Sequence, residues 1–427
     1  MNGFDLSTIS GLYVGSTEYT SIYKGSTLIW TKSGPTPIDY SREYLTIESL
    51  EDNNDIAFKA NDSSLLRTIQ VSTDKTNWTS YTSSTSGTTL TTLNTGDKLY
   101  VRGSNDYYAT SSTIYNYFTS SRTFNVSGNI MSLIYGDNFV NQTTLSEIYT
   151  FCYLFRNCTL LVDISNLILP ATTLTNYCYY CMFYGCTSLT TTPELPATTL
   201  TIRCYSYMFR DCTSLTTVPE LPATTLADYC YYCMFRSCKS LTAAPELQAT
   251  TLANNCYNSM FQNCTSLTTA PELPARILKQ QCYRSMFYNC TSLTTAPELP
   301  ATVLAISCYY GMFQNCTSLT TAPELLVKAL FNFCYTDMFN GCTSLTTAPE
   351  LPATNLKSSC YEQMFYGCTL INYVKALFTT DISSTTAYTN NWLYNVAATG
   401  TFVKSQSATW SKTGASGIPS GWTVTTI

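Results

Sequence analysis

The sequence predicts a multidomain chain with an N-terminal β-meander, a β-sandwich, a solenoid of α/β repeats and a β-rich C-terminal cap. The main observation is that two series of cysteines recur every 26 residues between positions 178 and 368. A fixed repeat of about 20–50 residues indicates a stacked architecture before any local motif is considered. Short runs of alternating apolar residues come before the array, and the repeat is lost after Thr369. These changes of pattern set the predicted domain boundaries.

The composition argues against several classes of function. Charged residues make up 11% of the 427 residues and the net charge is −5, so no clustered basic surface for binding nucleic acid is evident. The chain contains no histidine, which removes the commonest general base and the commonest metal ligand. We therefore expect no cofactor, no metal ion, no catalytic residues and no nucleic-acid partner, and we predict that the protein is not an enzyme.

The N-terminus does not have the pattern of a secretory signal, because MNGFDLSTISGLYVG lacks a basic region and a long apolar region. No stretch of the sequence approaches the ~18 apolar residues of a membrane-spanning helix. We expect a protein that does not insert into membranes and that folds in a cytoplasm. Its 20 cysteines would then be reduced thiols.

Residues 1–33 are predicted to form a β-meander that attaches the chain to another structure. A short phrase is doubled, YVGST at 13–17 and YKGST at 23–27, and it alternates with apolar residues. Such a small sheet cannot bury its own face, so it must dock on something. The residues expected to make this contact are Leu12, Tyr13, Val14, Ile22, Tyr23, Leu28 and Trp30. The segment resembles the attachment segments of tail-fibre and head-fibre proteins of tailed phages; the alternative is an edge hairpin packed on the next domain.

Residues 38–127 are predicted to form a β-sandwich of immunoglobulin-like type. Strand-like runs occur at 44–50, 55–60, 68–73, 98–103, 114–118 and 122–126. Six or seven short strands separated by turns are typical of such a sandwich, although the Cys–Trp–Cys signature is absent. We expect this domain to act as a spacer or a binding module. Residues 128–151 are predicted to cap the array, because an end repeat must cover an open core.

Residues 152–375 form the predicted solenoid, with one helix and one short strand in each 26-residue repeat. The apolar residues between the two cysteines of a repeat have the spacing of a stripe on one side of a helix. The Thr-rich segment that follows, with its Pro-Glu-Leu-Pro motif, indicates a short strand and a turn. The predicted core residues of the first full repeat are Cys178, Met182, Phe183, Cys186, Leu189, Leu195 and Leu200. A degenerate copy with Cys152 and Cys158 precedes it.

The cysteines of the array are predicted to be buried packing residues. Neighbouring helices lie ~8–10 Å apart, which exceeds the ~7 Å limit between the Cα atoms of a disulfide. Within one repeat, Cys178 and Cys186 would be separated by ~12 Å of helix. The alternative is zinc bound by Cys178-x-x-Cys181 and Cys230-x-x-Cys233, two pairs that lie two repeats apart and have no histidine to help them.

One glutamate recurs in every Pro-Glu-Leu-Pro motif or its variants. The series is Glu194, Glu220, Glu246, Glu272, Glu298, Glu324 and Glu350. Stacked carboxylates repel one another by about 1 kcal/mol per pair even in water, so they must face solvent. We interpret them as a solubilising stripe that protects an edge; a row of Ca²⁺ or ligand contacts is the alternative. Glycoside hydrolysis would need a pair of carboxylates that stands apart from the repeat, and none does.

The repeat resembles the BspA-like leucine-rich repeat, in which AFxxCxxLxxI is followed by IP and a new AF. The matching positions in the first full repeat are Met182–Phe183, Cys186, Leu189, Leu195–Pro196 and Leu200. The unit of 26 residues is longer than is usual in that family. The resemblance covers residues 147–375. It implies adhesion, or other contact with proteins and glycans at cell surfaces, without catalysis.

Residues 376–427 are predicted to form a β-rich cap. The segment 400–424 has strand patterning, and the tail contains Trp392, Trp410 and Trp422. We interpret these tryptophans as a plug over the last repeat; a sugar site is the alternative. The ending is similar to those of BspA-like repeat proteins from gut bacteria and their phages.

Together these features favour a surface protein of a tailed-phage virion, similar to fibre or decoration proteins of crAss-like gut phages and made in the host cytoplasm. Its N-terminus would bind capsid or tail proteins, and a dimer or trimer would present the solenoid to glycans or proteins of the bacterial surface or mucus. The predicted ligand face consists of Arg203, Arg210, Arg236, Lys279 and Arg284 on the solvent side of the helices. The second hypothesis is a bacterial cell-surface adhesin whose leader is missing. The third is a glycan-degrading enzyme.

Overall fold

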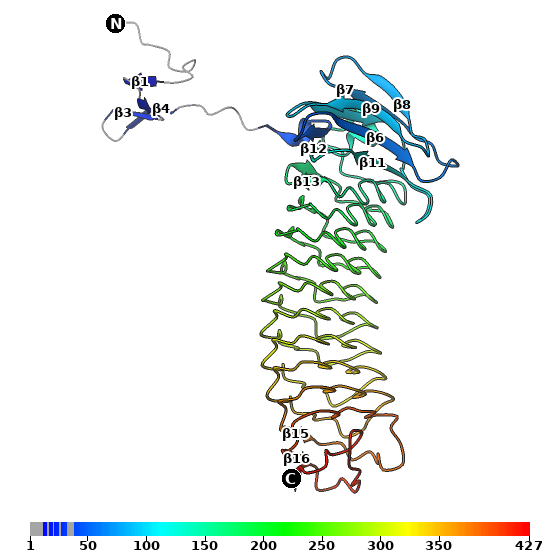
Figure 1. Ribbon diagram of the computed structural model, residues 1–427, viewed down its shortest axis with the longest axis vertical. Coiled ribbons are helices and arrows are strands. Elements are labelled where there is room, and N and C mark those ends of the chain that lie inside the picture. The colour runs from blue at the N-terminus through cyan, green and yellow to red at the C-terminus, as the bar shows by residue number, and fades with distance from the viewer. Residues whose placement is uncertain (1–11, 15–16, 20, 25–26, 32–37) are drawn as a thin grey trace. The chain divides into compact units, whose positions relative to one another are not determined.

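The computed structural model describes residues 12–14, 17–19, 21–24, 27–31 and 38–427, with side chains from residue 38 onward. It divides into two compact units, residues 1–40 and residues 41–427. In the second unit, a β-domain lies at one end of a stack of coils, and the C-terminus lies at the other end (Figure 1).

The first unit contains two antiparallel hairpins. Strand β1 (Leu12–Val14) pairs with β2 (Thr17–Tyr19), and β3 (Ser21–Lys24) pairs with β4 (Thr27–Thr31). The described residues form two separate two-stranded sheets, so the continuous meander expected from the doubled phrase is not shown. The seven residues expected to attach the chain lie on β1, β3 and β4, and their role stays a prediction.

The second unit begins with a β-domain, preceded by the 3₁₀ turn η2 (Tyr40–Arg42). Its strands are β5 (Leu45–Ser49), β6 (Asn54–Ala60), β7 (Thr68–Ser72), β8 (Thr79–Thr82), β9 (Thr88–Leu93), β10 (Lys98–Gly103), β11 (Asn116–Ser120) and β12 (Phe124–Asn129). They form two antiparallel sheets with the orders β12-β5-β10-β7-β8 and β11-β6-β9. Burial alternates along β6 and β10, as expected for strands with one face on a core. The six strand-like runs predicted from the sequence coincide with β5, β6, β7, β10, β11 and β12 to within three residues at each end, whereas β8 and β9 were not predicted.

The order of the strands differs from that of an immunoglobulin sandwich. There the first, second and fifth strands share one sheet. Here β5, the first strand of the domain, lies in one sheet, whereas β6 and β9 lie in the other. Strand β5 pairs on one side with β10 and on the other with β12, the strand that leads into the coils. Six of the eight strands were predictable from the sequence, but the immunoglobulin-like arrangement is not shown.

Strand β12 joins the β-domain to the array. The elements that follow it are α1 (Ser132–Tyr135), η3 (Gly136–Asn138), β13 (Leu161–Asp163) and β14 (Leu167–Ile168). Both β13 and β14, in the first coil, pair in parallel with β12. The Ser132 hydroxyl donates a hydrogen bond of 2.8 Å to the carbonyl of Val101, which holds α1 against the sheet. The ring of Phe118 stacks on that of Phe155 at 5.4 Å, so the β-domain itself covers the first coil.

Each coil of the array contains a run of β-turns where the sequence predicted a helix. Within residues 38–427, α1 is the only α-helix, and none of the described helices has the length and apolar character of a membrane span. Along each run the N–H groups alternate between two acceptors. Met234 N donates to Tyr231 O of its own coil (3.2 Å), which closes a turn. Tyr231 N donates to Cys256 O of the next coil (3.0 Å), which fixes the register between the two coils.

These turns place a left-handed residue at every fourth position. In the coil just described, Tyr229, Cys233 and Ser237 have φ angles of 59°, 53° and 64°. Left-handed residues cannot continue a right-handed helix, so the helix prediction is wrong. The last of the three positions is Asn, Gly, Asp or Ser in every coil. Because Asn, Asp and Gly tolerate positive φ, this pattern was the available signal for turns.

The Thr-rich return segments stack in parallel, but they form single bridges rather than strands. Such bridges join Thr225 to Thr251 and Thr251 to Ile277. Threonine hydroxyls strengthen the stack: Thr216 Oγ1 donates to Thr190 O of the preceding coil at 3.1 Å. The prolines of the motif, two in most repeats and one at 245–248 and 323–326, lack the N–H that a continuous ladder needs, which explains why the predicted strand is reduced to a bridge.

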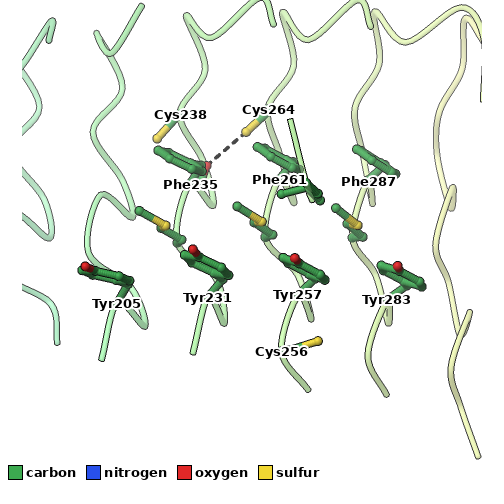
Figure 2. Packing of buried hydrophobic residues seen from close by; sticks show 14 of the residues in the cluster. Tyr205, Tyr231, Phe235, Cys238, Cys256, Tyr257, Phe261, Cys264, Tyr283 and Phe287 are labelled. Atoms are coloured by element: carbon green, nitrogen blue, oxygen red, sulfur yellow. Dashed lines mark hydrogen bonds between the residues drawn. The ribbon is translucent and has the colours of Figure 1, made fainter. Parts of the chain in front are cut away.

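Identical side chains stack in columns through the array (Figure 2). The ring centroids of Tyr231 and Tyr257 lie 5.7 Å apart with planes 5° apart. Those of Phe235 and Phe261 lie 5.8 Å apart with planes 4° apart. The predicted core residues of the first full repeat are all buried. Columns form because the hydrogen bonds between coils hold every coil in the same register.

All 20 cysteines are buried free thiols. The second cysteine of each repeat donates a hydrogen bond to the phenylalanine carbonyl of the preceding coil, as Cys264 Sγ does to Phe235 O at 3.1 Å (Figure 2). These thiols are therefore donors as well as packing residues. The spacing argument against disulfides is wrong, since the tyrosine rings of adjacent coils lie only 5.7 Å apart at Tyr179 and Tyr205, closer than packed helices at ~8–10 Å.

Cys152 does not belong to the column of first cysteines. Phe151 N donates to Cys178 O at 2.8 Å, which places Thr150 in line with Cys178. Cys152 instead packs with Cys181 in a separate small cluster of buried residues. The degenerate first copy is thus a true coil. However, Thr150, and not Cys152 as the sequence predicted, occupies the position of the first cysteine.

The coils continue beyond the point where the repeat sequence is lost. Phe365 N donates to Trp392 O at 2.9 Å, which adds a further coil. A parallel sheet completes this end, with strands β15 (Tyr373–Ala376), β16 (Thr401–Lys404) and β17 (Thr423–Thr426). Trp392, Trp410 and Trp422 are buried, and each indole N–H donates to a backbone carbonyl. They therefore act as the predicted plug and do not line a surface sugar site.

The left-handed positions predict an unusual pattern of substitution effects. Ser237→Val should lower the free energy of unfolding by about 1–2 kcal/mol or more, because a β-branched residue is strained at positive φ. Ser237→Gly should change it by no more than about 1 kcal/mol. Lys239→Val, an exposed change two residues away at ordinary φ, is the control. Urea denaturation measures all three; equal effects of the two valines would contradict the assignment.

The thiol hydrogen bonds predict a difference between the two cysteine columns. Cys264→Ala removes a donor and leaves a cavity, whereas Cys256→Ala leaves only a cavity, because the structure shows no hydrogen bond from the Cys256 thiol. We expect Cys264→Ala to cost about 1 kcal/mol more in the free energy of unfolding. Thermal and chemical denaturation check this. Losses of the same size would mean that the thiols serve packing alone.

Candidate functional site

The outer side of the first four coils carries a surface of tyrosine and arginine, called the Tyr–Arg face below. Along each run of turns, two residues that point into the core alternate with two residues that point away from it. The outward residues of successive coils therefore also lie in columns. The face consists of Tyr149, Tyr153, Arg156, Tyr177, Tyr180, Tyr184, Arg203, Tyr207, Arg210, Tyr229, Tyr232 and Arg236.

Tyrosine rings form a row across the coils of this face. Tyr153, Tyr180, Tyr207 and Tyr232 follow one another at centroid distances of 5.6, 5.6 and 5.1 Å, each ring nearly perpendicular to the next. This edge-to-face geometry is a favoured arrangement of aromatic pairs. The β-domain extends the row, because Tyr115, next to β11, lies 4.4 Å from Tyr153.

Two arginines lie close to the ring of Tyr184, one in the coil before it and one in the coil after it. The guanidinium carbons of Arg156, in the first coil, and Arg210, in the third, are each 5.4 Å from the ring centroid of Tyr184 in the second. Arg203 lies 4.1 Å from the ring centroid of Tyr229. These distances are within the range of cation–π attraction. The arginines are therefore held in place mainly by aromatic rings.

Three arginines of the face keep a buried donor without an acceptor. The Nε atoms of Arg156, Arg210 and Arg236 are inaccessible to solvent and have no hydrogen-bond partner among residues 38–427. Arg210 Nε lies 3.3 Å from a carboxylate oxygen of Asp211, but not in hydrogen-bonding geometry. In the described part of the chain, no acidic side chain forms an ion pair with Arg156, Arg203 or Arg236. An unsatisfied buried donor of this kind costs about 1–3 kcal/mol.

A pocket of about 240 Å³ opens on the face. Its lining consists of Tyr153, Arg156, Tyr180, Cys181, Tyr184, Tyr207 and Arg210. Burial raises the pKa of the Cys181 thiol to about 12, although the nearby guanidinium groups of Arg156 and Arg210 oppose this. The thiol is therefore protonated at neutral pH and is a poor nucleophile. The pocket offers aromatic faces, phenol hydroxyls and guanidinium donors.

The structure divides the five residues of the predicted ligand face. Arg203, Arg210 and Arg236 come together on the Tyr–Arg face. Arg284 lies on an outward position farther along the array, 4.3 Å from the ring centroid of Tyr310. Lys279 is exposed on the segment that precedes the turns of its coil and is not part of the face.

Sequence reasoning missed Arg156 and the tyrosines. Arg156 follows a phenylalanine, as do Arg210 and Arg236, and this repeated Phe-Arg pair was the signal that could have identified it. The first coil was predicted only as a degenerate copy with Cys152 and Cys158, and none of its residues was included in the predicted ligand face. The tyrosines were not among the residues of the predicted ligand face, and only the turn geometry shows that they gather into one surface.

The zinc alternative for the Cys-x-x-Cys pairs is wrong. Cys178 belongs to the main core, whereas Cys181 lies in the small cluster beneath the Tyr–Arg face. The alternation of inward and outward pairs separates the two thiols, although they are close in sequence. In the described part of the chain, no group of three or more His, Cys, Asp or Glu residues is placed to hold a metal ion.

The recurring glutamates line shallow grooves on another side of the array. One groove, of about 520 Å³, is lined by two successive Pro-Glu-Leu-Pro segments, around Glu194 and Glu220. Each glutamate of the series is exposed, as expected for a solvated stripe. At its end, Glu350 forms an ion pair of 2.9 Å with Lys375.

Comparisons with known proteins identify the repeat. The model of the "BspA type Leucine rich repeat region (6 copies)" matches residues 135–268, 172–320 and 280–413, which together span well over half of the chain. A search of curated proteins finds no match. Among solved structures, the crystal structure of a TLR13–ssRNA13 complex aligns with 17% identity and a TM-score of 0.28, over 54% of this chain and 31% of that chain. This chain therefore spans about a third of the length of that structure.

Proposed function

Because the chain belongs to the BspA-type leucine-rich repeat family, we propose that it is a surface adhesion protein without catalytic activity. The Tyr–Arg face is the proposed contact surface. The observation that carries this proposal is the pair of arginines, Arg156 and Arg210, that line one pocket on either side of Tyr184, next to a row of partly buried tyrosines. Tyrosine and arginine are the residue types most often found at energetically important positions of interfaces.

The stacking of coils does not require tyrosine or arginine at these positions. In the fifth coil the equivalent outward positions hold Asn258 and Ser259, and in the seventh one of them is Gly311. These coils use the same backbone bonds, as between Ser259 N and Arg284 O at 2.8 Å. The chemistry of the Tyr–Arg face is therefore not a by-product of stacking, which supports a binding role.

The residues of the face support a non-catalytic role. Cys181 stays protonated at neutral pH, and phenols and guanidinium groups are poor nucleophiles in that state. Glycoside hydrolysis commonly uses two carboxyl groups about 5–9.5 Å apart. The residues that line the pocket include no carboxylic acid. Adhesion is therefore a better account of this surface than hydrolysis.

The adhesion proposal predicts which surface charges matter. The triple variant Arg156→Gln, Arg210→Gln and Arg236→Gln should weaken binding to intact bacterial cells or mucin-coated surfaces by about tenfold or more, because it removes the guanidinium groups of the face. Binding of the labelled full-length protein is measured by flow cytometry and on coated plates.

The matched control removes the same charge elsewhere. Arg276→Gln, Lys279→Gln and Lys328→Gln change three exposed residues outside the face. Thermal melting of both triple variants verifies that they are folded. Unchanged adhesion in the first variant, or an equal loss in the control, would show that the ligand binds at another surface.

We propose two placements for the protein, on a bacterial cell surface and on a phage virion. The first rests on the role implied by the family. The second rests on the resemblance of residues 13–17 and 23–27 to the attachment segments of phage fibres, with synthesis in the host cytoplasm. In both placements, residues 1–40 would attach the chain and leave the array free to bind its ligand. They would bind the envelope on a bacterial cell, and capsid or tail proteins on a virion. Assembly as a dimer or trimer is part of the same proposal.

Deleting the N-terminal unit tests attachment of the chain separately from adhesion to the ligand. Deleting residues 1–40, a compact unit of its own, should release the protein from its particle or cell and leave ligand binding unchanged. Antibody detection on purified virions and on fractionated bacterial envelopes measures the first effect and distinguishes the two placements. If the truncated chain stays attached, another segment makes the contact.

A further inference from the structure

We propose that the Tyr–Arg face recognises an acidic carbohydrate, with one sugar ring and its carboxylate or sulfate seated in the pocket between Arg156 and Arg210. This inference rests on the proposed adhesive function and specifies its ligand class. The pocket of about 240 Å³ is smaller than the ~300–1,000 Å³ of typical small-molecule sites. It suits a single ring with its charged substituent better than a folded protein surface.

The two arginines of the pocket supply the contacts for the acidic group. Their guanidinium carbons lie at equal distances of 5.4 Å from the ring centroid of Tyr184, one from the coil before it and one from the coil after it. Both Nε donors are buried and unsatisfied. A carboxylate or sulfate in the pocket can accept hydrogen bonds from the guanidinium groups that line it, and charge-assisted hydrogen bonds of this kind are stronger than neutral ones. A neutral ligand group would satisfy the donors less well.

Charge balance favours an anion at this place on an acidic protein. The chain has a net charge of −5, yet the pocket brings two cations together with Asp211 as the nearby carboxylate. Arg156 also donates through its NH1 atom to the Tyr115 hydroxyl at 2.7 Å, which leaves its charge uncompensated. The local field is therefore positive and attracts anionic groups.

The tyrosines supply the contacts for the sugar ring. Tyr153, Tyr180 and Tyr207 present rings and hydroxyl groups around the two arginines. An aromatic body packs against the apolar C–H faces of a sugar, and its hydroxyl can bond to sugar hydroxyls. A row of such rings repeats from coil to coil, which matches a ligand that is itself a chain of rings.

Negatively charged residues farther along the array would confine an anionic ligand to the first four coils. In the eighth and ninth coils the outward positions hold Asp337 and Glu362. Arg284, near Tyr310, is the cation between the two regions. A polyanionic glycan would be repelled from the far end and held at the end next to the β-domain.

The test compares acidic and neutral sugars of the same ring type on the full-length protein. We expect oligogalacturonate or a sulfated galactan oligosaccharide to bind about tenfold or more tightly than the matched neutral oligogalactose, and the affinity to fall as salt is raised. Isothermal titration calorimetry measures all three sugars. Equal affinity for acidic and neutral sugars would overturn the proposal. So would an equal affinity for an oligoglutamate peptide, because this would show that charge alone is recognised.

Two substitutions connect the affinity to the pocket. Arg156→Lys and Arg210→Lys keep the charge and remove the planar guanidinium group with its several donors, and each should weaken binding of the acidic sugar by about fivefold or more. Arg276→Lys, outside the face, should not change it. Full affinity in both pocket variants, with melting temperatures like those of the native chain, would overturn the assignment. If cell adhesion depends on the face while no acidic sugar binds, the adhesive function stands and this ligand class is wrong.

Discussion

Alternate N–H groups in each run of turns donate to the next coil, and this arrangement depends on a left-handed residue at every fourth position. Around Tyr231, one N–H reaches Cys256 O of the next coil at 3.0 Å, and the N–H of Met234 turns back to Tyr231 O at 3.2 Å. In an α-helix every N–H would instead bond within its own segment, and none would be left to hold a neighbour. The left-handed residues thus convert a segment of helical appearance into one layer of a stack.

The same register explains why the core consists of columns and why the ends need special residues. When coils are held in line, each inward side chain meets its own counterpart, so a residue type that stacks well can be used in every coil. The end coils lack such a counterpart. At one end Phe118 of the β-domain stacks on Phe155 at 5.4 Å, and at the other Trp392 covers Tyr361 at 6.2 Å. One hydrophobic core therefore runs from the β-domain to the last coil.

The sequence contained the period, the buried positions and the plug of tryptophans, because each follows from hydrophobic burial. The helix was a false inference: inward pairs such as Cys178–Tyr179 and Met182–Phe183 recur every four residues, which is close to the helical period of about 3.6. A glycine such as Gly185 indicates a turn in the sequence, because glycine readily adopts positive φ. Tyr229 also has a positive φ, of 59°, but its residue type does not indicate a turn. The Tyr–Arg face could not be predicted, because its members lie in different coils and gather only when the turn geometry and register are known.

The position of the face follows from the different constraints on the inward and outward residues of each coil. Inward positions are restrained by the columns, whereas outward positions are restrained only by the backbone angle, so their chemistry can vary along the array without disturbing it. Arginines therefore collect near the β-domain, and Asp337 and Glu362 lie toward the other end. The β-domain contributes directly, because the Tyr115 hydroxyl accepts a hydrogen bond of 2.7 Å from Arg156. A surface held between two rigid elements keeps its donors in fixed directions, which is the condition for recognising an acceptor by geometry as well as by charge.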